Sequence, residues 1–242
     1  MNLGPQPRMR QFFATVPVPC PYLSSHREQK LVVELGDGDA ELYAELSRAG
    51  FRRSHRLAYR PACRECTACV PVRIDCGVFV PTRSLRRVIR QNRDLHTRIR
   101  PPLATPEHYE LFSRYLRSRH GTSDMAGMTY RDYRAMVEDT PVETKLVEFR
   151  DAGGAHVGAC LTDWLTDGLS AVYSFFEPGQ PKRSLGTYII LWLIEAARAQ
   201  QLSSVYLGYW IERSDTMDYK RRFPALEGFV NSRWQTLQPP PE

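Results

Sequence analysis

Four cysteines are the residues whose spacing points most directly to chemistry. Cys63, Cys66 and Cys69 are separated by two residues each, and Cys20 lies far upstream. A tight turn lets thiolates at this spacing converge on one ion or cluster, and Cys20 is a candidate fourth ligand. The pattern therefore predicts a zinc or iron–sulfur site. Plain reduced thiols of an intracellular protein are the alternative.

Arginine is concentrated in one part of the chain. The 242 residues include 33 Lys and Arg against 27 Asp and Glu, a net charge of +6. Residues 52–100 hold thirteen arginines, no lysine and three acids, which gives this segment 13 − 3 = +10. Guanidinium groups pair bidentately with phosphate and stack on bases, so the segment predicts nucleic-acid contacts. A solvated basic surface is the alternative.

Five of these arginines follow a helical spacing. They share one broad face of a helix expected from Pro81 to about His96, whose buried side is Leu85, Val88 and Ile89. Such a face fits the backbone of an RNA, and an acidic surface of the same chain is the competing partner. The candidate RNA-binding residues are Arg83, Arg86, Arg87, Arg90 and Arg93.

A loop near residue 183 is the next candidate site. Residues 174–178 end an expected strand, and Arg183, Gly186 and Tyr188 lie where an apolar helix expected over residues 184–201 begins. The order is similar to the GNAT acetyltransferase loop, whose backbone N–H groups hold the pyrophosphate of coenzyme A. Tyr188 replaces a small residue of that loop, so we expect no acetyl-CoA to bind. A buried helix with an ordinary start is the alternative.

Aromatic and basic residues follow in the expected strand 204–210 and the loop after it. The strand carries alternate tyrosines, and the loop contains Tyr219, Lys220 and Arg221. Together they predict a cleft that can stack an adenine and receive a carboxylate. Tyrosines of the core are the alternative.

The expected elements are those of an α+β protein. Short strands and a helix over residues 40–48 precede the cysteines; helices follow over 105–120 and 130–138, and then three alternating strands, the apolar helix and a further strand. We expect an N-terminal cysteine-containing domain, residues 1–100, packed on a GNAT-like mixed sheet with helices, residues 101–242. Without an export signal or an apolar run of about 18 residues, the chain is expected to be cytoplasmic, with no membrane partner.

These motifs together resemble the bacterial aspartate/glutamate leucyl-tRNA-protein transferases, relatives of the eukaryotic arginyl-tRNA-protein transferases. The matching stretches run in one order from about Gln11 to Phe229: residues 20–23, 50–54, 59–63, 115–120, 174–178, 184–188 and 217–220. The resemblance implies transfer of Leu from Leu-tRNA to proteins that begin with Asp or Glu, in the N-degron pathway. Eukaryotic members carry a second cysteine where Leu23 stands here, and Cys66 and Cys69 can substitute for it.

The implied reaction is acyl transfer from an ester oxygen to an α-amine. Because an α-amine has a pKa of about 7.7–8.0, no strong base is required, and orientation supplies most of the rate. The candidate catalytic residues are Tyr188, Gly186 and Tyr219. The candidate substrate-binding residues are Arg119, His120, Lys220, Arg221 and Arg183. The rival functions are a GNAT N-acetyltransferase that uses acetyl-CoA and a non-catalytic, zinc-bearing RNA-binding protein.

Overall fold

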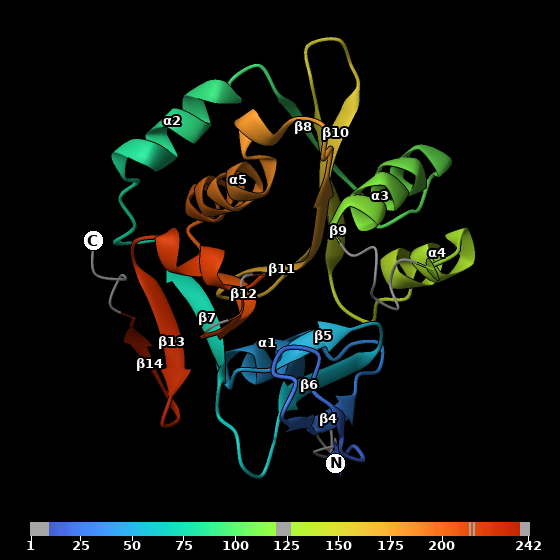
Figure 1. Ribbon diagram of the computed structural model, residues 1–242, viewed down its shortest axis with the longest axis vertical. Coiled ribbons are helices and arrows are strands. Elements are labelled where there is room, and N and C mark those ends of the chain that lie inside the picture. Colours follow the sequence, from blue (N-terminus) through green and yellow to red (C-terminus); the bar gives the residue numbers. More distant parts are fainter. Residues whose placement is uncertain (1–9, 120–126, 213, 215, 238–242) are drawn as a thin grey trace, which may run out of the picture.

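The protein consists of a small sheet with one helix and a large mixed sheet with helices on both faces (Figure 1). The computed structural model describes residues 10–119, 127–212, 214 and 216–237. This architecture confirms the α+β class predicted from the sequence. No helix in the described part of the chain is long and apolar enough to cross a bilayer.

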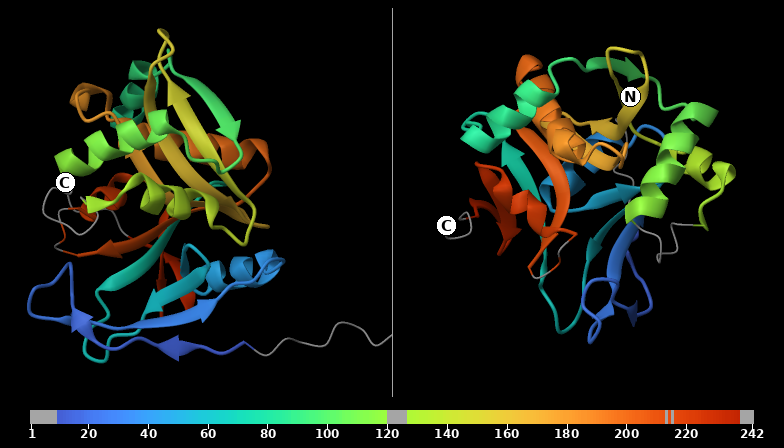
Figure 2. Two further views of the ribbon diagram at one scale, coloured as in Figure 1. Left: turned by 90° about the vertical axis from the view of Figure 1, so that its right-hand side faces the viewer. Right: turned by 45° about the horizontal axis from the view of Figure 1, so that its top comes forward.

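The small sheet is antiparallel and comes from the first quarter of the chain. Its order is β1 (Phe13–Ala14), β4 (Lys30–Glu34), β6 (Leu57–Pro61) and β5 (Arg52–Ser54), beside a hairpin of β2 (Val18–Pro19) and β3 (Arg27–Glu28). Helix α1 (Ala40–Arg48) connects β4 to β5 and buries Tyr43 and Leu46. Leu165 and Tyr206 of the large-sheet region join this core, so the two sheets are packed together (Figure 2).

The large sheet has eight strands and one parallel pair. Its order is β14 (Arg233–Thr236), β13 (Leu226–Val230), β7 (Cys69–Asp75), β12 (Ser204–Ile211), β11 (Gly168–Phe176), β10 (His156–Trp164), β9 (Thr144–Arg150) and β8 (His96–Arg100). Only β11 and β12 run parallel; the other neighbours are antiparallel.

Helices cover both faces of this sheet. Helix α5 (Leu185–Ala199) packs on β10, β11 and β12, and α2 (Arg83–Gln91) packs on α5. Because α5 lies between the sheet and α2, it is apolar on several sides, and seven of its residues are buried. Helix α3 (Pro106–Arg119) packs on the opposite face with α4 (Tyr130–Glu138) beside it (Figure 1).

Most predicted helices have the expected bounds, but the arginine-rich one is shorter. Helix α2 ends at Gln91, not near His96, and residues 96–100 form the edge strand β8. The stop is at Asn92, which is buried and donates to the carbonyls of Val88 and Arg183 at 2.9 and 2.8 Å. The domain division after residue 100 stays a prediction; β7 and β8, which precede it, are strands of the large sheet.

Candidate active site

The parallel strands β11 and β12 separate soon after they begin. They pair over three positions, from Gly168 opposite Ser204 to Ser170 opposite Tyr206. Beyond these pairs the facing edges of the two strands are free of each other, and side chains from other elements enter the space. We call this space the split. Backbone groups of β11 beyond these pairs are therefore not paired with β12 and can accept hydrogen bonds from other side chains.

Arg52 of the small sheet reaches into the split. Its Nη2 donates to the carbonyls of Ala171 and Val172 at 2.5 and 3.3 Å, and its Nη1 donates to Ser170 Oγ at 3.3 Å. Arg52 was not predicted as a site residue, because nothing in the local sequence distinguishes it from the twelve other arginines of residues 52–100. Its partners lie more than a hundred residues away in the chain.

Lys220 lies beside Arg52, on the 3₁₀ helix η3 (Asp218–Arg222) that follows β12. Its side chain is buried and its Nζ donates to the carbonyl of Tyr209 and contacts Met217 Sδ at 3.2 Å. Burial and then the positive charge of Arg52 lower the pKa of Lys220 to about 7. The neighbouring Tyr219 is partly exposed, with its ring 5.6 Å from Lys220 Nζ. The same burial that lowers this pKa encloses the ammonium against the Tyr209 carbonyl.

An aromatic row connects the split to the start of α5. The ring centre of Phe176, the last residue of β11, lies 4.9 Å from the ring centre of Tyr115. It lies 5.8 Å from Cζ of Arg119. A Cβ on Gly186 would lie 2.8 Å from the Phe176 ring, so only glycine lets the first turn of α5 approach so closely. The structure thus brings Gly186 and Arg119 to the same aromatic ring.

The other predicted site residues lie around this row. Tyr188 packs edge-on against Phe149 of β9, with ring centres 5.9 Å apart, and burial raises its pKa. Arg183 forms an ion pair with Asp94. The guanidinium of Arg221 lies over the Trp210 ring at 5.2 Å. His120 lies outside the described residues. Tyr188 and Arg183 are therefore on the β8–β9 side of α5, whereas Gly186 faces β11.

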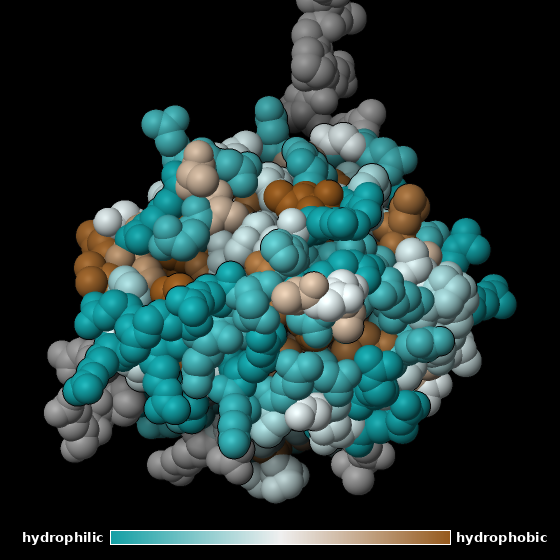
Figure 3. Space-filling view, turned by 90° about the horizontal axis from the view of Figure 1, so that it is seen from above, coloured by the Kyte–Doolittle hydropathy of each residue, from teal (hydrophilic) through white to brown (hydrophobic). Residues whose placement is uncertain are grey.

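The five arginines predicted to contact RNA are all exposed. They lie on α2 and the turn after it, and α2 contains no acidic residue in its first turn. Asp94, the acidic residue nearest to these arginines in the sequence, forms an ion pair with Arg183. The upper face of the molecule in Figure 1 is largely hydrophilic (Figure 3). Because Asn92 binds the carbonyl of Arg183 at 2.8 Å, the arginine row ends next to the start of α5.

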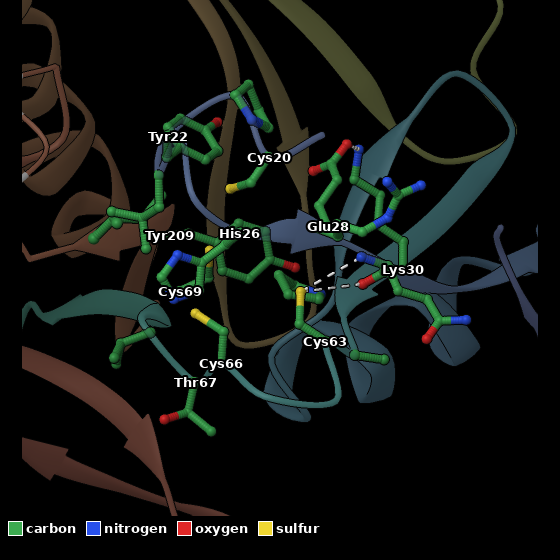
Figure 4. A pocket seen from close by; sticks show the side chains of 18 of the residues that line it. Cys20, Tyr22, His26, Glu28, Lys30, Cys63, Cys66, Thr67, Cys69 and Tyr209 are labelled. Atoms are coloured by element: carbon green, nitrogen blue, oxygen red, sulfur yellow. Dashed lines mark hydrogen bonds and ion pairs between the residues drawn. The ribbon is translucent and has the colours of Figure 1, made fainter. Parts of the chain in front are cut away.

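The four predicted metal-binding cysteines line one cavity of about 580 Å³. Cys20, Cys63, Cys66 and Cys69 line it together with Tyr22, His26, Glu28, Lys30 and Tyr209 (Figure 4). Tyr59 also lines the cavity. Burial and then the charges of the other three cysteines raise the pKa of Cys69 to about 12. The backbone N–H of Gln29 donates to Cys63 Sγ at 3.4 Å. Cys20 and Cys69, which are 49 positions apart in the sequence, thus line the same cavity.

The donor set fits a thiophilic metal by its chemistry. Four thiols in one cavity are the ligands that zinc and iron–sulfur clusters use. Among the described residues, no three His, Cys, Asp or Glu side chains already lie in a metal-binding arrangement. The four thiols line one cavity without forming a metal-binding arrangement in the described structure, and the metal stays a prediction.

Comparison with known proteins assigns the class and then the family. The protein is a transferase, because the family models and the relatives that it matches are named as transferases. Family models described as "Arginine-tRNA-protein transferase, N terminus" and "C terminus" match residues 18–87 and 107–230. The chain belongs to the arginine-tRNA-protein transferase family.

Individual relatives cover nearly the whole chain. The aspartate/glutamate leucyltransferase of Rhodospirillum rubrum is 52% identical over 236 residues, which cover 97% of this chain and 96% of the relative. The aspartate/glutamate leucyltransferase of Paramagnetospirillum magneticum is 51% identical over 240 residues, which cover 99% of this chain and 98% of the relative. Among solved structures, L-PGS from Bacillus licheniformis has a TM-score of 0.47 at 14% identity and covers 74% of this chain and 53% of its own.

Proposed function

We propose that this enzyme transfers leucine from Leu-tRNA to the N-terminal amine of proteins that begin with Asp or Glu. Relatives about 50% identical over nearly the full length carry the name aspartate/glutamate leucyltransferase, which supports the amino acid and the acceptors. The product would enter the N-degron pathway of protein degradation. We also propose that the reaction takes place in the cytoplasm.

The observation that carries this proposal is the position of the arginine row relative to the split. The row on α2 ends at the start of α5, and Gly186 at that start contacts Phe176 at the mouth of the split. A tRNA acceptor arm bound along α2 would therefore direct its 3′ end toward the split. The start of α5, with Arg183 beside it, is a favourable place for a phosphate.

The reaction depends more on the orientation of the two substrates than on a strong base. The neutral α-amine attacks the ester carbonyl, the new C–N bond forms, the bond to the ribose oxygen breaks, and the amine proton finally resides on that oxygen. Lys220 has a pKa near neutrality, so we assign it to move this proton. Backbone N–H groups near Gly186 and the phenol of Tyr219 are the candidate donors to the oxyanion. Tyr188, predicted from the sequence for this role, packs on the β8–β9 side of α5, opposite to Gly186.

Recognition of the acidic side chain needs an accessible cation. Arg119 is exposed at the end of α3, and its guanidinium lies over Phe176 at the mouth of the split. Arg221 is the second candidate. For Lys220 the proton-transfer role replaces the carboxylate-binding role predicted from the sequence, because its ammonium is buried against the Tyr209 carbonyl. A pocket that offers arginine can accept both Asp and Glu, since they differ by one methylene.

The cysteine cavity is proposed to hold zinc or an iron–sulfur cluster. Cys20, Cys63, Cys66 and Cys69 would bind it, and when bound it would tie the cysteine loop to the N-terminal hairpin. Tyr209 lines the cavity and its carbonyl accepts from Lys220, so the loop borders the split. Elemental analysis of the purified protein tests this: a Cys63→Ser, Cys66→Ser variant should lose the metal that wild type retains.

A donor and acceptor panel tests the proposed function. Leu-, Arg- and Phe-tRNA, each charged with labelled amino acid, are incubated with peptides that begin with Glu, Asp, Gln or Lys. Transfer from Leu-tRNA to the Glu and Asp peptides alone is expected. Binding of tRNA without transfer would favour a non-catalytic RNA-binding protein. Tight binding of acetyl-CoA in a calorimeter would favour an N-acetyltransferase.

A further inference from the structure

Arg52 occupies a place where both strands of the split depart from regular pairing. Strand β11 contains one extra residue, Val172, in its pairing with β10. Leu161 of β10 pairs with Tyr173 of β11, and the next residue, Thr162, pairs with Ala171. Such a bulge turns two consecutive carbonyls toward one side. Those are the carbonyls of Ala171 and Val172, and the same nitrogen of Arg52 donates to both.

The opposite wall of the split is shaped for the same guanidinium. Strand β12 has its own irregularity between Tyr206 and Gly208 in its pairing with β7. Gly208 has φ +78°, a conformation that disfavours other residues, and a Cβ there would lie 3.0 Å from Arg52 Nε. Arg52 is therefore fitted between a bulge on one strand and a glycine on the other.

The charge of Arg52 is held in the split by neutral groups. Within the part of the chain that the structure describes, its acceptors are two backbone carbonyls and the hydroxyl of Ser170, which orient the guanidinium without neutralising it. Its charge acts on Lys220 and on the phenols of Tyr209 and Tyr219. A fixed positive charge costs no reorganisation when negative charge develops near it.

We propose that Arg52 is a positioning residue of the acyl transfer, which holds β11 and β12 apart and fixes a positive charge in the split beside Lys220. The inference rests on the proposed function, since it concerns the site where that transfer takes place. Arg52 acts through the strands and through Lys220, and it need not touch either substrate.

Steady-state kinetics of leucine transfer tests this with graded substitutions. For Arg52→Gln we expect kcat to fall roughly 100-fold while KM for both substrates changes less than about threefold, as for a misplaced reacting group. Arg52→Lys keeps the charge but cannot bridge two carbonyls and a hydroxyl, so it should recover only part of the loss. The matched control is Arg56→Gln, which removes an exposed charge from the adjacent turn and should leave kcat unchanged.

Chemical rescue distinguishes positioning from a general effect on folding. Arg52→Ala leaves a space lined by the Ala171 and Val172 carbonyls, so guanidinium at concentrations too low to unfold the protein should restore kcat, and equimolar urea should not. A kcat near that of wild type in Arg52→Gln, or equal effects of guanidinium and urea on Arg52→Ala, would overturn the proposal.

A second variant keeps the test decisive if Arg52 substitutions do not fold. Ser170→Ala removes one acceptor of Arg52 and should lower kcat several-fold without raising KM; an unchanged kcat would count against the proposal. Wild-type protein that transfers no amino acid from any tRNA would instead remove the proposed function itself. The two failures are therefore distinguishable by whether wild type is active.

Discussion

Arg53 and Asp163 form a buried ion pair that joins the two sheets. Neither side chain is exposed, at 0% each. Arg53 Nε and Nη2 donate to the two carboxylate oxygens at 2.8 and 2.7 Å, and Thr144 Oγ1 donates to Asp163 Oδ1 at 2.6 Å. Because Arg53 follows Arg52 in β5, this pair also fixes the strand that sends Arg52 into the split.

Arg53→Met should be strongly destabilising. The change leaves the Asp163 carboxylate buried with Thr144 as its remaining side-chain donor, and breaking a buried pair in this way costs about 3–5 kcal/mol. For a protein of this size, the melting temperature should then fall by roughly 6–20 °C. A double variant, Arg53→Met with Asp163→Leu, removes both charges and should recover most of the lost stability.

Urea unfolding of the four proteins in the double-mutant cycle measures this coupling. The control is Arg134→Met, which breaks the exposed pair with Glu138, 2.8 Å long, and should lower the urea midpoint far less than Arg53→Met does. If Arg53→Met costs no more than this control, or if the double variant is less stable than both single variants, the account of the pair is wrong.

Three further predictions concern the tRNA surface, Lys220 and α5. Replacing Arg86 and Arg87 by Ala should reduce the slope of log affinity for tRNA against log salt by about 1.5, measured by filter binding; an unchanged slope would remove α2 from the interface. Lys220 keeps its proton up to about pH 10.5 when unfolded but loses it near pH 7 when buried. The stability of wild type relative to Lys220→Met should therefore rise with pH across that window, and a flat difference in urea midpoints would contradict the burial argument. Gly186→Ala places a Cβ 2.8 Å from the Phe176 ring and should cost about 1–3 kcal/mol in urea unfolding, whereas no loss would show that the ring moves freely.

Local sequence patterns predicted most of the elements around the split. The helices over residues 40–48 and 130–138 have the predicted bounds, because capping residues and apolar spacing act within a few positions. Strands β8, β13 and β14 were missed, and the helix before β8 was predicted to reach about His96 although it ends at Gln91. Strands β8 and β14 are the exposed, polar edges of the large sheet, so their sequences lack the alternation that identifies a half-buried strand. Strand β13 lies inside the sheet and is only five residues long, with a glycine at its centre.

The site itself depends on contacts that no local pattern contains. Arg52 and Arg53 are adjacent, yet one enters the split and the other a buried ion pair, because successive residues of a strand point to opposite sides. Lys220 was predicted to bind the acidic acceptor, and nothing in the local sequence indicated that packing of η3 against β12 buries it. The partner strand decides which arginine or lysine enters the site. For Arg52 that strand lies more than a hundred residues away in the sequence.

The most direct test of the central claim is mass spectrometry of two peptides that differ only in their first residue. Each peptide, beginning with Glu or with Gln, is incubated with the purified protein and Leu-tRNA. The account predicts that one leucyl residue is added to the α-nitrogen of the Glu peptide and none to the Gln peptide. Equal addition to both peptides, addition at a lysine side chain, or no addition at all would contradict it.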